Sequence, residues 1–425
     1  MAGRELLVVS GTEPVGSLYR RGAEIAFRYA ASWQQRVDAT PLSVAMPLIV
    51  DVHDDDVVRP WLWGLLPDND RVLARWARTF HTTAKQPLGL LAAVGADLPG
   101  QFQILAPESL PVAAPSGVEW LTEADVARLL RDVRADHTAW LGSGVHAGRW
   151  SLAGAQAKIA LRLVDGRWGR PYGRAATTHI LKPAIAGLDD HDLNEHLCLQ
   201  AARRCGLPAV PSQLVSIGDE RAVCIERYDR VLASDGSVMR VHQEDLCQAL
   251  ATHPEHKYEA DGGPGVVTIG ALLTRCMPDT VSRRAREQFV DALALNWLLG
   301  GTDAHAKNYA LLLSGAQVRL APLYDLASAL PYPGVHEDKL KLAMRVGGRY
   351  QASRLTADHW RAAAAQLDLA GEAVVARVAA LAASLPASLR ACAEAAEVSV
   401  LGSPLPERLT EAISRRCARL ERRLA

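Results

Sequence analysis

The sequence predicts an α+β protein with a mixed α/β first part, a strand-rich middle and a helical last part. Up to residue 230, short apolar runs alternate with polar residues and are bounded by glycine or proline, as in strands. After Met239 the apolar side chains follow a helical spacing instead, and alanine becomes abundant. Because 425 residues exceed one ordinary core, we expect two or three domains.

Residues 1–108 are predicted to form a small mixed α/β domain. Its expected strands are 5–10, 15–19 and 25–29. A helix is expected over residues 70–80, because Val72, Leu73 and Trp76 return there at helical spacing. We interpret the tryptophans of this region as core residues.

Residues 109–238 are predicted to form a second domain, which follows a linker marked by Pro107, Pro111 and Pro115. Thr122 is a candidate helix cap, with an acidic residue three positions later. The expected strands are 159–164, a partner that begins at Arg167 after the Asp165-Gly166 turn, 177–182 and 222–230.

Residues 239–425 are predicted to form an all-α domain. The expected helices are 244–251, 269–274, 286–299, 357–367, 373–383 and 407–424. Five arginines between 415 and 423 make the last helix basic. We expect a solvated basic face there, and an acidic partner is the less favoured alternative.

Composition excludes several classes of protein. Lys+Arg and Asp+Glu are both 47, so bulk charge gives no attraction for nucleic acid or a membrane surface. The seven cysteines are scattered and form no C-x-x-C pair, which argues against a disulfide framework or a zinc site. We find no signal segment and no uninterrupted apolar run long enough to cross a bilayer. We therefore expect a cytoplasmic protein with no membrane partner.

The stretch from Gly300 to Asp325 carries the clearest chemistry. Asp303 is followed five residues later by Asn308 and, after an apolar run with a turn, by Asp325. Phosphoryl transfer needs one carboxylate to orient the attacking hydroxyl and further oxygen ligands for Mg²⁺. Asp303 and Asn308 are also common turn formers. The polar crowding of His305 and its neighbours between two apolar segments favours the site.

A second candidate feature is the small-residue loop 151–158, which ends in Lys158. Such a loop lets backbone N–H groups approach a phosphate, although it also occurs in plain tight turns. Lys182 closes a predicted buried strand and needs an anion. That anion is either a nucleotide phosphate or the carboxylate of Glu195, which is also compatible with a solvated helix start.

Two further segments are candidates for the same site. The strand that ends at Glu226-Arg227-Tyr228-Asp229 suits a hinge between two lobes, where backbone groups could bind an adenine. The glycine-rich loop 257–265 either lines a cleft or only connects helices, and the residues do not decide between these.

Taken together, these segments resemble the HipA-type toxin serine/threonine kinases over nearly the whole chain. The similar segments are Ser151-Leu-Ala-Gly-Ala-Gln-Ala-Lys158, Thr178-His-Ile-Leu-Lys182-Pro, Glu226-Arg-Tyr-Asp-Arg230, His242-Gln-Glu-Asp245, 257–264, Thr302-Asp-Ala-His-Ala-Lys-Asn308, Leu323-Tyr-Asp325, Pro-Leu-Ser43 and Gly64-Leu-Leu-Pro-Asp68. The piece from Asp303 to Asn308 is also similar to the catalytic loop of phosphoinositide kinases. Gly301 stands where some relatives have Asn, and Ala157 occupies a variable position.

The resemblance implies a two-lobed, protein-kinase-like fold, similar to phosphoinositide kinases, with an added N-terminal subdomain. It implies that Asp303 is the base, Asn308 and Asp325 are Mg²⁺ ligands, and Lys182 and His305 belong to the catalytic set. It further implies autophosphorylation at Ser151. The implied ATP-binding residues are Ser151, Ala153, Gly154, Ala155, Gln156, Lys158, Lys182, Glu226, Arg227, Tyr228, Asp229, His305 and Tyr324.

The resemblance also implies partners. Members of the family pair with a small helix-turn-helix antitoxin (HipB-like) that binds operator DNA, and they act on a protein substrate such as an aminoacyl-tRNA synthetase. We therefore predict a toxin kinase that uses ATP and Mg²⁺. The alternatives are a small-molecule phosphotransferase on a similar scaffold and a non-catalytic co-repressor module.

Overall fold

The computed structural model describes residues 5–107, 116–141, 150–185 and 187–424. They form two compact units. Unit 1 comprises Met1–Pro183, Val215–Glu255 and Leu311–Val318, and unit 2 comprises Ala184–Leu214, His256–Ala310 and Arg319–Ala425. The predicted linker residues Pro111 and Pro115 lie outside the described residues. The predicted division at residues 108 and 238 stays a prediction.

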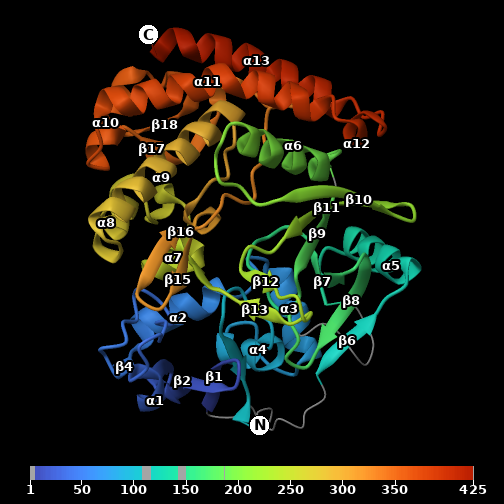
Figure 1. The fold of residues 1–425 in the computed structure, drawn as a ribbon, viewed down its shortest axis with the longest axis vertical. Coiled ribbons are helices and arrows are strands. Elements are labelled where there is room, and N and C mark those ends of the chain that lie inside the picture. The colour runs from blue at the N-terminus through green and yellow to red at the C-terminus, as the bar shows by residue number, and fades with distance from the viewer. Residues whose placement is uncertain (1–4, 108–115, 142–149, 186, 425) are drawn as a thin grey trace. The chain divides into compact units, whose positions relative to one another are not determined.

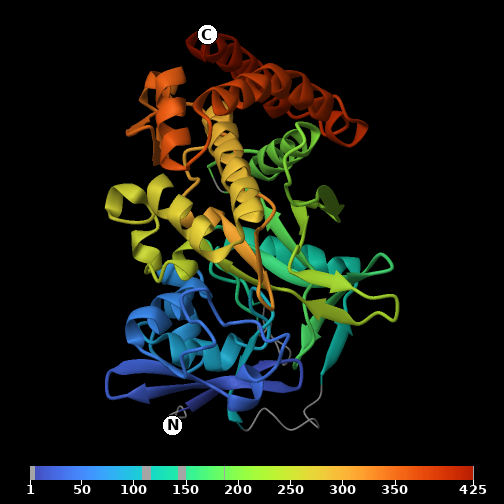
Figure 2. The same cartoon turned by 60° about the vertical axis from the view of Figure 1, so that its left-hand side comes forward.

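Unit 1 begins with a five-stranded antiparallel sheet in the order β4-β3-β2-β1-β5. Its strands are β1 (Glu5–Ser10), β2 (Glu13–Arg21), β3 (Glu24–Tyr29), β4 (Val52–His53) and β5 (Gln103–Leu105). The accompanying helices are α1 (Ala31–Gln34), α2 (Asp55–Gly64), α3 (Asp70–Thr79) and α4 (Pro87–Val94). Figures 1 and 2 show α2, α3 and α4 on one face of this sheet. The three strands and the helix predicted here are confirmed.

A second sheet of unit 1 has the order β10-β11-β9-β7-β8-β6. Its strands are β6 (Gly117–Trp120), β7 (Ile159–Val164), β8 (Arg167–Tyr172), β9 (His179–Pro183), β10 (Ser212–Ile217) and β11 (Glu220–Glu226). Helix α5 (Glu123–Ala135) packs against β7, β9 and β11. Thr122 accepts the Asp125 N–H and completes the predicted capping box.

Both sheets of unit 1 share one hydrophobic core, because a single cluster of buried side chains extends from Leu6 to Ala222. Trp76, which we expected to be a core residue, lies there with two later tryptophans. Trp140 stacks on Trp150 with ring centroids 6.3 Å apart, and Trp76 meets Trp140 edge-on at 6.5 Å. The residues of the first two predicted domains therefore contribute to one shared hydrophobic core.

The rest of unit 1 is short. A two-stranded ribbon pairs β12 (Arg230–Leu232) with β13 (Val238–Arg240). Strand β14 (His242–Asp245) forms a three-stranded sheet with the hairpin β15 (Ala310–Ser314) and β16 (Gln317–Leu320). The helix predicted over 244–251 is wrong at its start, because Asp245 ends β14 and caps the short α7 (Leu246–Ala249).

Unit 2 is mainly helical. Its helices are α6 (His191–Arg204), α8 (Val266–Cys276), α9 (Asp279–Leu299), α10 (Ala357–Gln366), α11 (Gly371–Ala393), α12 (Ala396–Ser399) and α13 (Leu405–Leu424). The hairpin of β17 (Lys341–Val346) and β18 (Arg349–Gln351) packs against α8, α9 and α10 through β17. We had expected an all-α domain from the alanine-rich helical periodicity. The last part of the chain also contains strands, so that expectation is wrong in this respect.

The structure bears on two expectations about the last helices. Helix α11 has the length and mean hydropathy of a membrane span, but Arg377 interrupts its apolar residues, so the expectation of no uninterrupted apolar run is not contradicted. It packs against α6, α9, α10 and α13, as a core helix does. On α13, Arg416 is buried, donates to the Trp297 carbonyl at 2.7 Å and pairs with Glu337. The basic face is therefore only partly solvated.

Candidate active site

The segment from α9 to Asp325 brings the predicted chemistry together within unit 2. Helix α9 ends at Gly300, whose φ of +67° is the left-handed conformation that glycine adopts most easily. The chain then passes the exposed Asp303 and enters a single 3₁₀ turn, Ala306–Asn308. His305, Lys307 and Asn308 are buried, which leaves Asp303 as the exposed polar group of this loop.

Asn308 and Asp325 are in direct contact. The Asn308 Nδ2 donates to Asp325 Oδ2 at 3.2 Å. Asp325 has a φ of +58°, which is unusual for a residue other than glycine and stores backbone strain of the kind found at functional sites. This contact confirms that the two residues lie together, as their shared predicted role requires.

The oxygen of the Asn308 side-chain amide, Oδ1, is buried and has no hydrogen-bond partner within the described chain. An unpartnered buried carbonyl oxygen is unfavourable unless a ligand completes it. Amide and carboxylate oxygens are the ligands that Mg²⁺ takes, and it binds with few protein ligands alongside phosphates and water. The described residues contain no group of three or more His, Cys, Asp or Glu side chains placed to hold a metal. A site of Asn308 and Asp325 fits Mg²⁺ without such a group.

Two tyrosines contact the residues of this loop. The Tyr258 hydroxyl donates to Asp303 Oδ1, and the Tyr258 ring meets the His305 ring edge-on with centroids 4.9 Å apart. The Tyr324 hydroxyl donates to the Lys307 carbonyl at 2.6 Å. Sequence reasoning singled out the loop of Tyr258 but not Tyr258 itself, because nothing in the loop's composition shows which residue faces Asp303.

The predicted phosphate loop lies in unit 1 and is held by the N-terminal part of that unit. Ser151 is fully buried, and its hydroxyl donates to the Leu65 carbonyl at 2.6 Å. The Ser151 N–H donates to the Asp97 carbonyl at 3.0 Å, and the Asp68 N–H donates to the Gly154 carbonyl at 3.2 Å. The Gly64-to-Asp68 segment that the resemblance singled out therefore forms part of the loop's binding surface.

The loop is also closed on its own lysine. The Lys158 Nζ donates to the Ala153 carbonyl at 2.6 Å and lies 5.0 Å from the Trp140 ring centroid. Gly154 has a φ of +99°, and a Cβ there would come within 2.9 Å of that Nζ. Gln156 Nε2 is 3.5 Å from the Pro183 carbonyl, and Lys182 is buried in β9 beside it. These contacts bring Lys158, Gln156 and the end of β9 into one neighbourhood.

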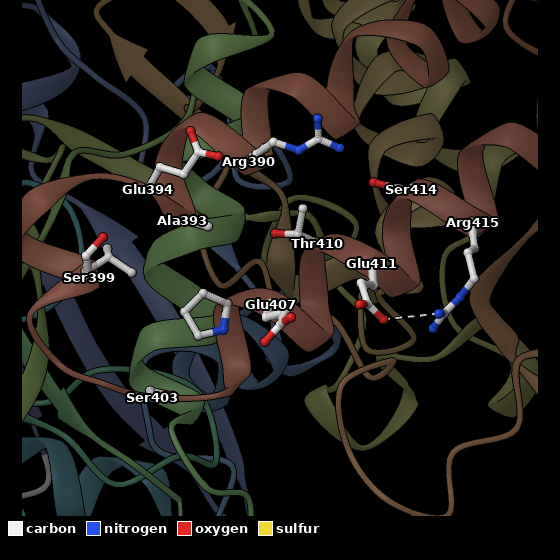
Figure 3. Close-up of a pocket in the computed structure, with 12 residues that line it drawn as sticks. Arg390, Ala393, Glu394, Ser399, Ser403, Glu407, Thr410, Glu411, Ser414 and Arg415 are labelled. Atoms are coloured by element: carbon white, nitrogen blue, oxygen red, sulfur yellow. Dashed lines mark hydrogen bonds and ion pairs between the residues drawn. The ribbon is translucent and has the colours of Figure 1, made fainter.

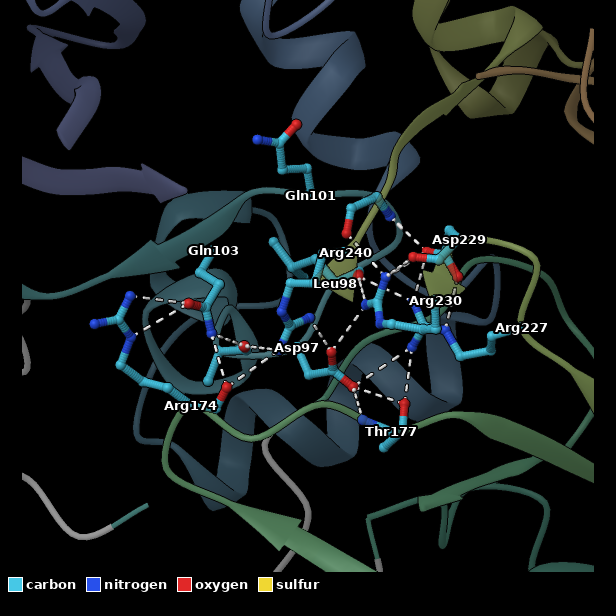
Figure 4. A network of polar contacts seen from close by, with 12 residues as sticks. Asp97, Leu98, Gln101, Gln103, Arg174, Thr177, Arg227, Asp229, Arg230 and Arg240 are labelled. Carbon is cyan, nitrogen blue, oxygen red and sulfur yellow. Dashed lines mark hydrogen bonds and ion pairs between the residues drawn. The ribbon is translucent and has the colours of Figure 1, made fainter. Parts of the chain in front are cut away.

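The predicted hinge residues have unequal roles. Arg227 and Asp229 are buried in an ion network with Asp97, Arg230 and Arg240 (Figure 4). The network occupies these two side chains, but the adenine contacts expected of this segment are made by backbone groups, so Arg227 and Asp229 stay predicted ATP-site residues. The Tyr228 hydroxyl donates to Gln243, and Glu226 is exposed at the end of β11. Tyr228 and Glu226 stay predicted hinge residues.

Asp97 is the centre of this network, and sequence reasoning missed it. Its Oδ1 accepts Arg230 Nη2 at 2.9 Å, and its Oδ2 accepts Thr177 Oγ1 at 2.7 Å. Burial alone raises the pKa of Asp97, but the charges of Arg240, Arg230 and Arg227 outweigh burial and hold that pKa below its ordinary value. Arg227 and Arg230 in one short motif were the available signal, but arginine is usually exposed, so their residue types did not show that they need a buried carboxylate.

A separate pocket of about 580 Å³ lies in unit 2 between α11, α12 and α13 (Figure 3). Arg390, Glu394, Thr410 and Arg415 contribute to its lining, and Arg415 pairs with Glu411. None of the predicted catalytic, ATP-binding or metal-binding residues lines it, although Arg415 of the predicted basic helix does. The pocket is therefore distinct from the candidate active site.

Comparisons with known proteins agree with this arrangement. The family model of the HipA N-terminal domain matches residues 6–105, and that of the HipA-like C-terminal domain matches residues 150–389. A Sinorhizobium fredii protein named "Putative kinase Y4mE" is 36% identical over 344 residues, which cover 80% of each chain.

Two further relatives come from Shewanella oneidensis. A protein named "Serine/threonine-protein kinase toxin HipA" is 25% identical over 348 residues, which cover 78% of this chain and 76% of that protein. A solved complex of HipA, HipB and operator DNA contains a chain that matches with a TM-score of 0.81 and 23% identity, covering 99% of this chain and 96% of that chain. At that identity the structural match shows a shared fold.

We predict that Asp97→Asn strongly destabilises unit 1. The change leaves the buried Arg227 and Arg230 and the half-buried Arg240 with only Asp229 as a counter-charge, and a broken buried ion pair typically costs ~3–5 kcal/mol. The pKa of Asp97 is depressed in the folded state. Its contribution to the free energy of unfolding is therefore complete above its unfolded-state pKa near ~4 and is lost as pH falls through its folded-state pKa. Urea unfolding at pH 7 measures the loss of unfolding free energy in the variant.

The matched control is Asp235→Asn, an exposed aspartate of the same unit that bonds only the Ser237 region. Its unfolding midpoint should stay close to that of the wild type. Equal midpoints for the Asp97 and Asp235 variants would show that the network contributes nothing specific.

Proposed function

The chain belongs to the HipA family, and on this premise we propose that it is an ATP-dependent serine/threonine protein kinase that acts as the toxin of a toxin–antitoxin pair. The observation that carries the proposal is the Asn308–Asp325 contact, in which a buried amide oxygen is left without a partner beside a strained aspartate. The names of the S. fredii and S. oneidensis relatives support kinase activity.

In the proposed reaction, the Asp303 carboxylate orients the attacking hydroxyl of the substrate and accepts its proton. Asn308 Oδ1 and the Asp325 carboxylate would hold Mg²⁺, which neutralises charge on the transferred phosphoryl group when it is bound. Lys182, Lys158 and the backbone of the loop from Ser151 would contact the ATP phosphates. Each residue thus supplies either position or charge, which is what phosphoryl transfer requires.

Two alternatives differ in whether they need these residues. A small-molecule phosphotransferase would need the same base and Mg²⁺ ligands, and a labelled γ-phosphate that appears on a small acceptor and not on protein would favour it. A non-catalytic co-repressor would need neither. The retention of an unpartnered buried oxygen and a strained aspartate, both unfavourable without a ligand, argues against the second alternative.

We also propose a cytoplasmic setting with a helix-turn-helix antitoxin that carries the chain to operator DNA, and a translation component such as an aminoacyl-tRNA synthetase as the protein substrate. The HipA chain of the S. oneidensis structure is in complex with HipB and operator DNA, which supports the choice of partner. The equal numbers of acidic and basic residues in this chain leave little intrinsic attraction for DNA phosphates.

Self-inactivation through Ser151 is part of the proposal. A buried hydroxyl that donates to the Leu65 carbonyl leaves no room for a phosphate with close to two negative charges. A phosphorylated Ser151 would therefore have to leave this position and would take the loop with it. Loss of the closed loop would weaken ATP binding.

The first test compares two aspartates. Asp303→Asn should leave ATP binding nearly intact and reduce transfer by ~10²–10⁴-fold, because it removes the base. Asp325→Ala should weaken Mg²⁺-dependent ATP binding, because it removes a ligand. Labelled-ATP titration and phosphate transfer measure both, with the exposed Asp358→Asn as the control. Equal losses of binding in the first two variants would contradict the assigned roles.

The second test concerns DNA. At physiological salt, the chain alone should not shift DNA from upstream of its own reading frame, whereas a mixture with a helix-turn-helix protein encoded beside it should. A gel-shift series over salt concentration is the measurement. Sequence-specific binding by the chain alone would contradict the proposal that the antitoxin carries it to DNA.

The third test concerns Ser151. After incubation with Mg-ATP, mass spectrometry should find phosphate on Ser151, and the modified form should bind ATP more weakly than the unmodified form. Ser151→Ala serves as the control, since it should lose ~1 kcal/mol of loop stability but accept no phosphate at this position. Phosphate on another residue, or unchanged ATP affinity when Ser151 carries it, would refute self-inactivation.

A further inference from the structure

The loop 257–265 is anchored at both sides of Tyr258. On one side, the Lys257 carbonyl accepts the Ala306 N–H of the catalytic loop at 3.2 Å. On the other side, the Glu259 carboxylate accepts the backbone N–H of Arg345 at 2.6 Å and its Nε at 2.8 Å. Arg345 belongs to β17, so Tyr258 sits on a short segment fixed between the catalytic loop and that strand.

The loop also folds back on itself around Tyr258. The Tyr258 carbonyl accepts the N–H groups of Asp261 at 3.1 Å and Gly263 at 3.0 Å. The Tyr258 ring is fixed separately by its edge-on contact with the buried His305. Backbone and ring are thus both restrained, which limits the directions that the phenol hydroxyl can take.

The phenol hydroxyl is directed toward Asp303. The Tyr258 hydroxyl donates to Asp303 Oδ1, and within the described residues it is the one side chain that hydrogen-bonds this exposed carboxylate. The other carboxylate oxygen, Oδ2, makes no hydrogen bond in the described part of the chain. One oxygen is therefore held by the loop, and the other remains available to a substrate hydroxyl.

We propose that Tyr258 is a positioning residue that orients the Asp303 carboxylate for proton abstraction, and that the loop 257–265 exists to hold it there. This inference rests on the proposed function. An exposed aspartate samples several rotamers, and each rotamer other than the productive one lowers the rate. A fixed hydrogen bond to one oxygen removes that loss before the substrate binds.

The expected effect follows from the strength of a hydrogen bond to a charged group. Removal of the hydroxyl in Tyr258→Phe, which keeps the ring on His305, should lower kcat by ~10- to 100-fold. The KM for ATP should change by less than about twofold, because Tyr258 contacts the base and not the metal ligands. A role in folding alone would not produce this split.

The experiment uses the full chain with Mg-ATP, following ³²P incorporation into protein and ADP release for the wild type, Tyr258→Phe and Tyr350→Phe. Tyr350 undergoes the same chemical change in unit 2 beside Arg345, and its variant should match the wild type. A parallel thermal-unfolding cycle with Asp303→Ala, which removes the oxygen that accepts the Tyr258 hydroxyl, tests the contact itself. If the contact exists, the double variant should lose no more Tm than the larger single variant.

The outcomes separate the two claims. A wild type that transfers no phosphate refutes the proposed function, whatever the variants do. If the Tm losses of the single variants do not add in the double variant but kcat is unchanged in Tyr258→Phe, only the positioning role is overturned. If the Tm losses add, the contact itself is overturned. Tm losses that do not add, together with a reduced kcat and an unchanged KM for ATP in Tyr258→Phe, support the inference.

Discussion

Asp97 is the constraint on which the organisation of unit 1 depends. Its carboxylate holds Arg227, Arg230 and Arg240 in the interior, while its backbone carbonyl accepts the N–H of Ser151. One residue thus fixes both the chain after β11 and the start of the phosphate loop. Because a buried carboxylate is stable only when it is paired, the loop and the motif around Arg227 cannot adopt their positions independently.

In unit 2 the arrangement follows a different principle. Its site keeps features that oppose stability: a left-handed aspartate at 325, a buried oxygen of Asn308 without a partner, and an exposed Asp303. Local strain of this kind persists where a ligand or a reaction makes use of it. The surrounding contacts, such as Glu259 with Arg345, supply the rigidity that these features lack.

The sequence predicted what depends on local pattern. Strands β1, β2 and β3 of the first sheet, the hairpin at Asp165-Gly166 and the cap at Thr122 are confirmed, since each follows from neighbouring residues. It could not predict Tyr258 with Asp303 or Asp97 with Arg230, because these pairs lie 45 and 133 residues apart. Strand β14 was missed because its ladder depends on a distant partner.

The central claim is that Asn308 and Asp325 together form a Mg²⁺ site for phosphoryl transfer. A crystal structure of the chain with a non-hydrolysable ATP analogue and Mn²⁺, located by anomalous scattering, tests it most directly. We predict a metal bonded to Asn308 Oδ1 and an Asp325 carboxylate oxygen at roughly 2.0–2.2 Å. A bound nucleotide whose metal lies away from both residues would contradict the account.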